Sequence, residues 1–518
     1  MAKPAGIAPR SRRRWLARAY SRRGIVPVMA LILGAGGFLR VWALGEIGFN
    51  SDEAVYAGQA VALAGDPVLA GLFPVFRAHP LLFQIVLSLG FSGGMTDTGA
   101  RLWSVLFGLA TVVAVYLLGK LLYGRKAGLV AALFLAVMPY HVVVTRQVLL
   151  DGPETFFAVI TLYCVARFCS ERDPRWLYSA AAVMGLTVLT KESAVILVLA
   201  LFVFFVLSRE YRIRLRDLLI VLTIMSAVVV AYPLSLSLSH RTGTGQNYLA
   251  WQLFRRANHE ITFYGETVTM AVGPALIVLA ACGLWLLRGQ NTWREWLLVC
   301  WIVVPLVFFH LWPVKGYQYL LPIVPAVAVL AARTGVHATV PRWSGSRPAA
   351  ARSVRAAAVF AVGASLVVPA WLAVNPAPGT TFLAGSGGVP GGREAGRWIK
   401  ASLPEGSRLM TIGPSMANLV RFYGHRKAFA LSVSPNPLSR NPSYEPIDNP
   451  DRELRGGDLQ YVVWDAFSAA RAPFFGERLM RYVHKYGGVA VHTETVEVTT
   501  AGGRSTPKPV IVVYEVRP

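Results

Sequence analysis

Two adjacent carboxylates follow the first long apolar stretch of the chain. The stretch runs from Ile25 to Leu44, and Asp52-Glu53 lie shortly after it. Because a carboxylate is costly to desolvate at the mouth of a membrane span, the pair indicates a site. Desolvation and nearby cations tune the pKa of such a group, which can then act as a general base or support a metal. The alternative is structural, since Ser51 or Asp52 would cap a helix over 53–64 and stabilise it by about 1 kcal/mol.

Further polar groups lie where other apolar stretches end. Arg146 and Asp151 stand at a chain turn and offer an arginine and a second carboxylate, or simply a capped helix start with Pro153 in its first turn. Lys191, beside Glu192, separates two short apolar stretches. Its ammonium can hold a phosphate as a point charge or reach outward to the membrane interface. For Arg40, near the end of the first apolar stretch, the sequence favours reaching to the interface.

A polar loop over 239–266 has the composition of a sugar-phosphate site. It contains the Arg255-Arg256 pair, whose guanidinium groups can bind phosphate oxygens in a bidentate manner, together with aromatic residues and His259. Lys315 and Tyr319 open a later apolar stretch and suit either a phosphate clamp or an interfacial anchor. His259 and His79 are isolated histidines, so each is only weak evidence for a metal ligand.

The elements that position these groups are mostly membrane spans. Of the 518 residues, 54% are hydrophobic and 15% charged, with a mean hydropathy of +0.48. A soluble chain carries about 25% charged residues. The net charge of +24 comes mainly from short loops between apolar stretches, which is typical of cytoplasmic loops beside anionic lipid and argues against a nucleic-acid partner. The four cysteines lie inside apolar stretches and predict core packing: Cys164, Cys169, Cys282 and Cys300.

Hydropathy predicts about eleven membrane helices. The segment 80–93 is apolar but short, and we interpret it as a re-entrant or interfacial helix. The positive-inside rule then places the N-terminal segment 1–24 in the cytoplasm and the candidate residues above on the outer face. The predicted spans are 25–44, 101–122, 127–145, 154–169, 177–190, 193–208, 217–238, 268–288, 295–312, 317–333 and 356–374.

The last part of the chain changes character. A Gly/Pro-rich linker over 375–392 precedes a region, 393–518, in which helical and strand patterns alternate. This alternation predicts that the chain is a polytopic α-helical membrane protein with a small C-terminal extracytoplasmic α/β domain. The predicted helices are 393–402, 415–423 and 474–486, and the predicted strands are 408–412, 459–464, 489–498 and 508–516.

Taken together, these motifs resemble the GT-C glycosyltransferase superfamily. The similar branch contains the dolichyl-phosphate-mannose protein mannosyltransferases and the bacterial lipid A aminoarabinose transferase. The resemblance covers about residues 25–335 and implies a GT-C-like catalytic membrane domain over 25–374, with juxtamembrane helices in an outer loop at 45–100. It rests on the order of Asp52 to Tyr56, His79-Pro80-Leu81, Arg101-Leu102, Tyr123-Gly124-Arg125, Pro139-Tyr140-His141, Asp151, Lys191 and Tyr319-Leu320-Leu321-Pro322.

The resemblance implies transfer of a sugar, with inversion, from a polyprenyl phosphate donor to an envelope glycan, lipid or protein. Asp52 would be the base that activates the acceptor hydroxyl, with Glu53 beside it and Asp151 as a second catalytic carboxylate. The lipid phosphate would be held by Lys191, Arg255, Arg256, Lys315 and Tyr319. Substrate contacts would come from Tyr56, His79, Arg146 and His259.

The sequence departs from the family just before Pro80 and leaves two other functions open. Some relatives carry a metal-binding acidic residue just before the proline at position 80, where this chain has Arg77-Ala78-His79, so use of a divalent metal stays open. The alternatives are a transporter or flippase of a lipid-linked sugar and a non-catalytic envelope assembly protein. A transporter would need polar groups near mid-span, whereas these ionisable residues cluster at one interface.

Overall fold

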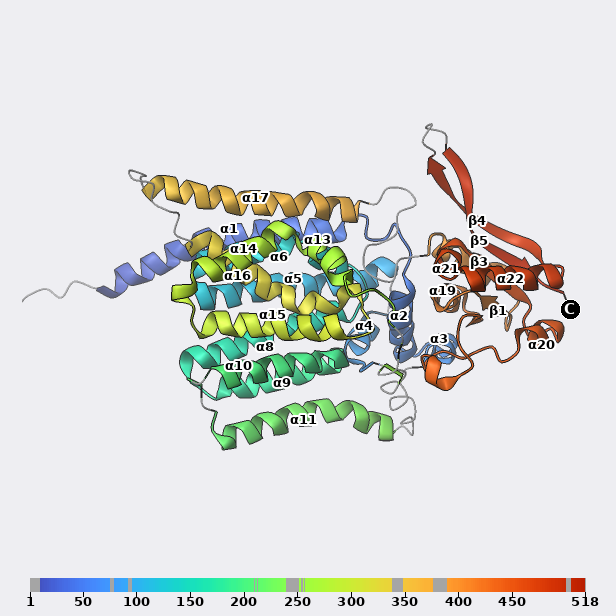
Figure 1. Cartoon of the computed structure of the whole chain (residues 1–518), viewed down its shortest axis with the longest axis horizontal. Helices are drawn as coiled ribbons and strands as arrows, with labels where there is room; N and C mark the ends of the chain where they lie inside the picture. Colours follow the sequence, from blue (N-terminus) through green and yellow to red (C-terminus); the bar gives the residue numbers. More distant parts are fainter. Residues whose placement is uncertain are drawn as a thin grey trace, which may run out of the picture.

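The computed structural model describes residues 10–74, 79–91, 96–208, 210–211, 213–238, 251–252, 255, 257–337, 348–375, 389–499 and 505–517. A bundle of long helices forms one body, and an α/β body formed by residues 389–517, here called the C-terminal domain, lies at one end of it (Figure 1). Between the two lie the short helices α2 (Ser51–Leu63), α3 (Pro67–Leu72) and α4 (Leu82–Phe91). Helix α4 is the apolar segment predicted over 80–93.

Each predicted span corresponds to helix in the bundle. Some are interrupted by short helical turns: η1 (Glu192–Ala194), η2 (Tyr264–Val268), α13 (Thr269–Val272), η3 (Arg288–Gln290) and η4 (Tyr317–Ile323). The longer helices are α1 (Arg10–Val41), α5 (Asp97–Tyr123), α6 (Arg125–Val137), α7 (Pro139–Val144), α8 (Asp151–Glu171), α9 (Arg175–Thr190), α10 (Val195–Leu207), α11 (Leu215–Leu238), α14 (Pro274–Leu286), α15 (Trp293–Leu311), α16 (Val324–His337) and α17 (Pro348–Val374).

The lengths of these helices do not fix the number of spans. Within the described residues, six helices are long and apolar enough to cross a membrane, or seven if the pair Tyr264–Val272 and Pro274–Leu286, bent by 89°, is one span. The bend falls at Gly273, whose φ of +98° favours glycine, directly before a proline that lacks an N–H. Similarly, Pro139 separates α6 from α7. The count of eleven spans therefore stays a prediction.

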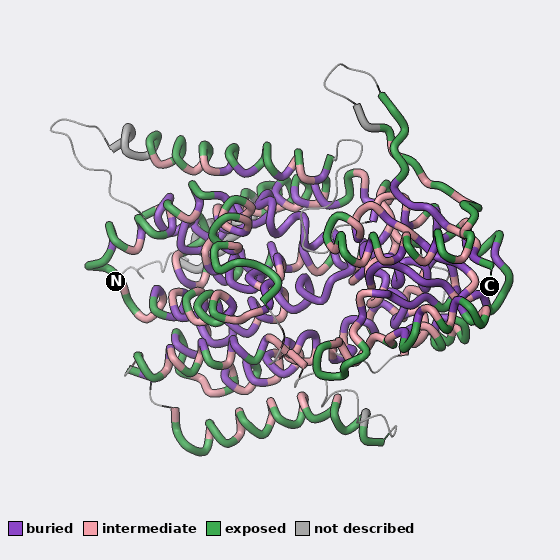
Figure 2. The backbone as a smooth tube through the Cα atoms, turned by 45° about the vertical axis from the view of Figure 1, so that its right-hand side comes forward, coloured by how far each residue is buried: buried purple, intermediate pink, exposed green. Residues whose placement is uncertain are grey.

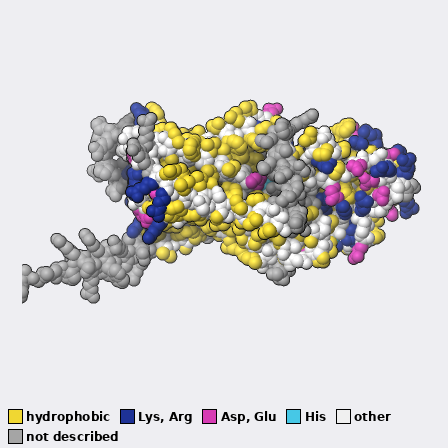
Figure 3. Space-filling model, turned by 90° about the horizontal axis from the view of Figure 1, so that it is seen from below, with side chains coloured by type: hydrophobic (Ala, Val, Ile, Leu, Met, Phe, Trp, Pro, Cys, Tyr) yellow, Lys and Arg dark blue, Asp and Glu magenta, His cyan; other side chains and the backbone are white. Residues whose placement is uncertain are grey.

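The centre of the bundle is buried, and its exterior is apolar. In the most apolar window of Tyr317–His337, 83% of the residues are buried, whereas none is buried in that of α11, where exposed and intermediate residues alternate (Figure 2). Helices α5 and α6 touch through glycines, since a Cβ at Gly119 would lie 2.9 Å from the Cα of Gly128. Hydrophobic side chains cover the middle of the bundle, and Lys and Arg gather at the end away from the C-terminal domain (Figure 3).

The C-terminal domain is built on a five-stranded sheet of order β2-β1-β3-β5-β4. Strands β1, β2 and β3 are parallel, and β5 pairs antiparallel with β3 and β4. Strand β2, α20 and α21 are additions to the predicted elements. The strands are β1 (Arg408–Thr411), β2 (Lys427–Ala430), β3 (Tyr461–Asp465), β4 (Val489–Thr499) and β5 (Ser505–Glu515); the helices are α18 (Gly392–Ser402), α19 (Pro414–Gly424), η5 (Pro437–Ser439), α20 (Pro450–Arg455), α21 (Ala466–Arg471) and α22 (Pro473–Lys485).

Candidate functional site

Asp52 lies in the first turn of α2, behind a complete capping box. The cap is Asn50, one residue before the predicted Ser51 or Asp52. Its Oδ1 accepts hydrogen bonds from the backbone N–H groups of Asp52 and Glu53, both at 3.0 Å, and Glu53 Oε2 accepts one from the N–H of Asn50, also at 3.0 Å. Asp52 is half-buried.

Glu53, in contrast, is fully enclosed. Arg101 donates to it from Nε at 2.8 Å and from Nη2 at 2.7 Å, and the N–H of Val148 donates at 3.0 Å. The side chains of Glu53 and Arg101 are 0% and 1% exposed. The two neighbouring carboxylates predicted to be catalytic therefore occupy different surroundings. Glu53 ties α2 to α5 and to the segment before α8, and only Asp52 keeps part of its surface exposed.

Lys191 lies at the centre of a second group of charges. Its Nζ donates to Asp151 Oδ1 at 2.6 Å and lies 3.8 Å from Glu154 Oε2, one helical turn further along α8. It also lies 4.5 Å from the centre of the Tyr319 ring. Three of the predicted site residues therefore lie together: Asp151, Lys191 and Tyr319. Glu154 was missed as a site residue, although its i+3 spacing from Asp151 on a helix would have indicated it.

His79 joins the loop before α4 to the break between α9 and α10. Its Nδ1 lies 2.8 Å from Glu192 Oε2, and its ring meets that of Tyr56 edge-on, with centroids 6.0 Å apart. Burial alone would lower the pKa of His79, but the Glu192 carboxylate raises it above its ordinary value. Asp52 and Lys191 also lie within electrostatic reach of this ring, so the two groups of charges are neighbours.

The Tyr319 phenol marks where these elements converge. Lys191, Arg255, Asp151 and Asp52 all lie within its electrostatic reach. They come from the α9–η1 junction, the loop after α11, the start of α8 and the start of α2. We call Asp52, His79, Asp151, Lys191, Glu192, Arg255 and Tyr319 the outer charge cluster, after the outer face on which the sequence predicts the candidate residues.

Two of the predicted phosphate ligands differ from Lys191 in their partners. Lys315 is 6% exposed, and its Nζ donates to the Trp312 carbonyl at 3.3 Å. Asn258 fixes its backbone by hydrogen bonds of 2.8 and 2.9 Å. The half-buried Arg255 guanidinium lies 4.6 Å over the ring of Trp251. Among the residues that the structure describes, neither cation forms an ion pair with a carboxylate, whereas Lys191 already has two.

The remaining predicted residues lie in other settings. Arg146 is 2% exposed and donates to the carbonyls of Trp42 at 2.6 Å and Val374 at 3.3 Å, so it links the ends of α1 and α17. His259 is exposed and stacks on Phe263, with ring centroids 4.2 Å apart. Partial burial, Arg471 of α21 and Lys315 lower the pKa of His259. Arg256 lies outside the described residues.

The prediction for Arg40 was wrong. Its side chain is 0% exposed and donates to Thr145 Oγ1 at 2.9 Å and to the Ala136 carbonyl at 2.9 Å, and its Nη2 lies 2.7 Å from His141 Nδ1. The break before Pro139 leaves carbonyls at the end of α6 without helical partners. These acceptors hold the guanidinium inside the bundle, so it does not extend to the interface.

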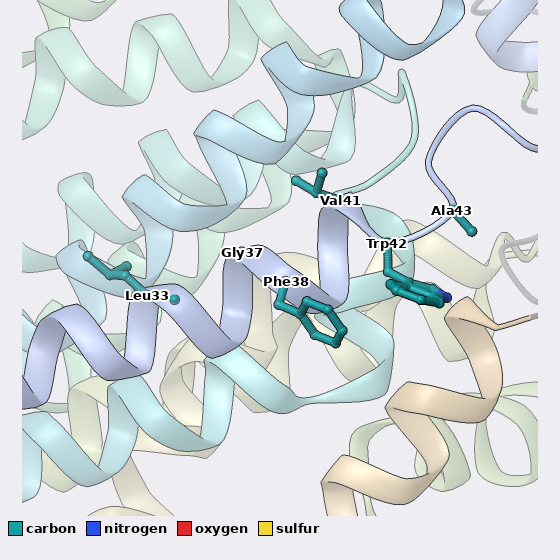
Figure 4. A pocket seen from close by; sticks show the side chains of 7 residues that line it. Leu33, Gly37, Phe38, Val41, Trp42 and Ala43 are labelled. Atoms are coloured by element: carbon teal, nitrogen blue, oxygen red, sulfur yellow. The ribbon is translucent and has the colours of Figure 1, made fainter.

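The described residues contain no group of three or more His, Cys, Asp or Glu side chains placed to hold a metal ion. A groove of about 540 Å³ runs along the end of α1 (Figure 4). Its lining includes Leu33, Phe38, Val41 and Trp42 but no ionisable side chain. The groove is therefore separate from the outer charge cluster, which is the candidate functional site.

Comparisons with known proteins agree with this fold. Residues 78–236 match the family described as dolichyl-phosphate-mannose-protein mannosyltransferase. The undecaprenyl phosphate-alpha-4-amino-4-deoxy-L-arabinose arabinosyl transferase of Pectobacterium carotovorum is 29% identical over 319 residues, which are 56% of this chain and 56% of that protein. The chain spans about half the length of the curated relatives it matches.

Among solved structures, ArnT from Cupriavidus metallidurans in the apo state is similar to 95% of this chain and 98% of its own, with a TM-score of 0.68 and 15% identity. The same protein bound to undecaprenyl phosphate gives a TM-score of 0.65 at 15% identity, with the same coverage of 95% and 98%. These matches confirm the predicted resemblance to the GT-C glycosyltransferase superfamily.

Proposed function

We propose that this protein is an integral membrane glycosyltransferase that moves one sugar, with inversion, from a polyprenyl phosphate donor to an acceptor of the cell envelope. The observation that carries the proposal is the outer charge cluster. It sets a half-buried carboxylate, Asp52, beside cations at one end of a bundle with this fold. The relative's complex with undecaprenyl phosphate supports the choice of donor.

The cations divide into two kinds. Asp151 and Glu154 neutralise the charge of Lys191, so Lys191 has little net charge to offer a ligand. Lys315 and Arg255 have no carboxylate partner among the described residues, and an enclosed ammonium such as that of Lys315 is stabilised by an anion. We therefore assign the donor phosphate to Lys315 and Arg255, with Lys191 and Asp151 fixing the ring of Tyr319 beside it.

The reaction needs one base and one stabilised leaving group. The Asp52 carboxylate accepts the proton of the acceptor hydroxyl, whose oxygen attacks the anomeric carbon on the face opposite the phosphate. The bond from that carbon to the phosphate oxygen breaks, and its electron pair stays on the polyprenyl phosphate. A positioned base contributes about 10²–10⁴ in rate, and alignment of the two substrates contributes several kcal/mol more.

Orientation follows from charge. Lys and Arg side chains gather at the end of the bundle away from the C-terminal domain (Figure 3), and such clusters favour the cytoplasm. We therefore infer that the protein is multi-pass in the cell membrane, with its N-terminus inside. The outer charge cluster and the C-terminal domain then lie outside, where a polyprenyl phosphate sugar meets an envelope glycan, lipid or protein.

The test is transfer by the purified protein from a panel of labelled polyprenyl phosphate sugars to envelope acceptors. Asp52→Asn should reduce turnover at least ~10²-fold. Asp66→Asn is the matched control, because Asp66 caps α3 on the same side and asparagine caps equally well. Lys315→Ala and Arg255→Ala should weaken binding of the donor, whereas Asp52→Asn should not. Turnover that survives in Asp52→Asn would move the base to another residue, and no turnover of any donor with any acceptor would refute the enzyme.

A further inference from the structure

The C-terminal domain and the membrane-side helices share one apolar core. Phe49, two residues before the start of α2, is 2% exposed, and its ring lies 5.2 Å from that of Phe422 and 6.1 Å from that of Tyr423, both in α19. The same buried cluster includes Ala54, Ala57 and Ala60 of α2 and Ala417, Leu419 and Val420 of α19. A domain that swung freely on a linker would not share a core in this way.

Hydrogen bonds reinforce this contact along the chain that leads to Asp52. The Tyr423 hydroxyl accepts from the N–H of Phe49 at 2.8 Å and donates to Asp97 Oδ2 at 2.6 Å. Arg393 of α18 donates to the carbonyls of Gly45 at 2.8 Å and Glu46 at 3.0 Å. Residues 42–50 run as turns and loop, so these backbone groups have no helix or sheet to satisfy them.

The contact nearest to Asp52 is made by Asn418. This residue of α19 is 1% exposed, and its Nδ2 donates to Ser51 Oγ at 3.0 Å. Ser51 is the first residue of α2 and directly precedes Asp52. The outer end of α2 is thus held from two sides, by Arg101 on Glu53 and by Asn418 on Ser51.

We propose that Asn418 and Tyr423 are positioning residues for Asp52, so that the C-terminal domain is a working part of the active site. The inference rests on the proposed function. Loss of the Asn418 and Tyr423 contacts would loosen the end of the 42–51 segment and let the N-terminus of α2 shift, and a misplacement of about 1 Å can cost 10²-fold in rate. Donor binding, which we assign to Lys315 and Arg255, does not pass through this contact.

A double-mutant cycle tests the proposal. Asn418→Ala and Ser51→Ala should each lower kcat by between about 2- and 100-fold, and the double variant should lose no more than the worse single variant, because both remove one hydrogen bond. Tyr423→Phe should also lower kcat. Binding of undecaprenyl phosphate should stay unchanged in all of them. Tyr486→Phe is the matched control: its hydroxyl makes hydrogen bonds of 2.8 and 2.9 Å to Asp451, within the C-terminal domain.

Hydrogen exchange separates this inference from the proposed function. Asn418→Ala and Tyr423→Phe should speed amide exchange over residues 48–54 in the full-length protein, and Tyr486→Phe should not. A wild-type protein without turnover would refute the proposed function, while the exchange rates would still decide whether α19 restrains α2. Unchanged exchange, or losses of kcat that multiply in the double variant, would overturn the positioning role.

Discussion

Replacing Glu53 with alanine should unfold the protein more easily rather than remove a reacting group. Glu53 is 0% exposed and receives two hydrogen bonds from Arg101, which is itself 1% exposed. Removing one partner of a buried ion pair costs about 3–5 kcal/mol, because the other charge stays buried without its counter-ion. The N–H groups of Asn50 and Val148 also lose their acceptor, at about 1–3 kcal/mol each if they stay buried and unpaired.

The assay is unfolding of the purified protein in mixed micelles as the fraction of SDS rises, followed by tryptophan fluorescence. Glu295→Ala is the matched control. Glu295 is 3% exposed, completes the capping box of α15, and lies 3.1 Å from Arg333 at another place in the bundle. Both variants should lose similar stability, and Asp52→Asn should lose little. A Glu53→Ala protein that unfolds like wild type but has lost turnover would refute this reasoning and restore Glu53 as a catalytic group.

Three further predictions concern single sites. Gly48→Ala should weaken the docking of the C-terminal domain, measured as faster proteolysis of that domain, because the added Cβ would lie 2.6 Å from Arg393 Cβ. The charged form of His79 should stabilise the fold through Glu192 fully below pH 6.5, the pKa of histidine in the unfolded chain. This stabilisation should be lost as the pH rises through the raised pKa of His79 in the folded protein. The unfolding free energy of His79→Gln, measured against pH, should not show this loss. Burial raises the pKa of Asp465 to about 6. The free energy of unfolding of the wild type should therefore fall by at most about 3 kcal/mol as pH rises from 3.8 through 6. Thermal unfolding of Asp465→Asn should not show this fall.

The sequence predicts the helices of this fold well because long apolar runs and amphipathic periods are local signals. Helix α18 spans Gly392–Ser402 where 393–402 was predicted, and α22 spans Pro473–Lys485 where 474–486 was predicted. Strand β2 was not predicted, and it is defined by its parallel pairing with β1, a contact between separate segments of the chain. The division of predicted spans at Pro139 and Gly273 was missed because the hydropathy continues across both breaks.

The site was predictable in its residues and not in its pairings. Asp151 and Lys191 were indicated by charge at the ends of apolar stretches, but their ion pair joins residues 40 apart in the sequence. His79 and Glu192 are separated by 113 residues, and the sequence around one does not indicate that it pairs with the other. The sequence also could not distinguish the roles of Asp52 and Glu53. The structural role of Glu53 comes from its pairing with Arg101, which lies 48 residues later on α5.

The burial of Arg40 also bears on how the chain is synthesised. Its partners Ala136, His141 and Thr145 follow it by 96, 101 and 105 residues, so α1 is made well before the acceptors for its guanidinium exist. Until then the charge has to stay in water or among lipid headgroups, because an unpaired arginine is costly in hydrocarbon. We therefore expect α1 to reach its final depth only after α7 has been synthesised.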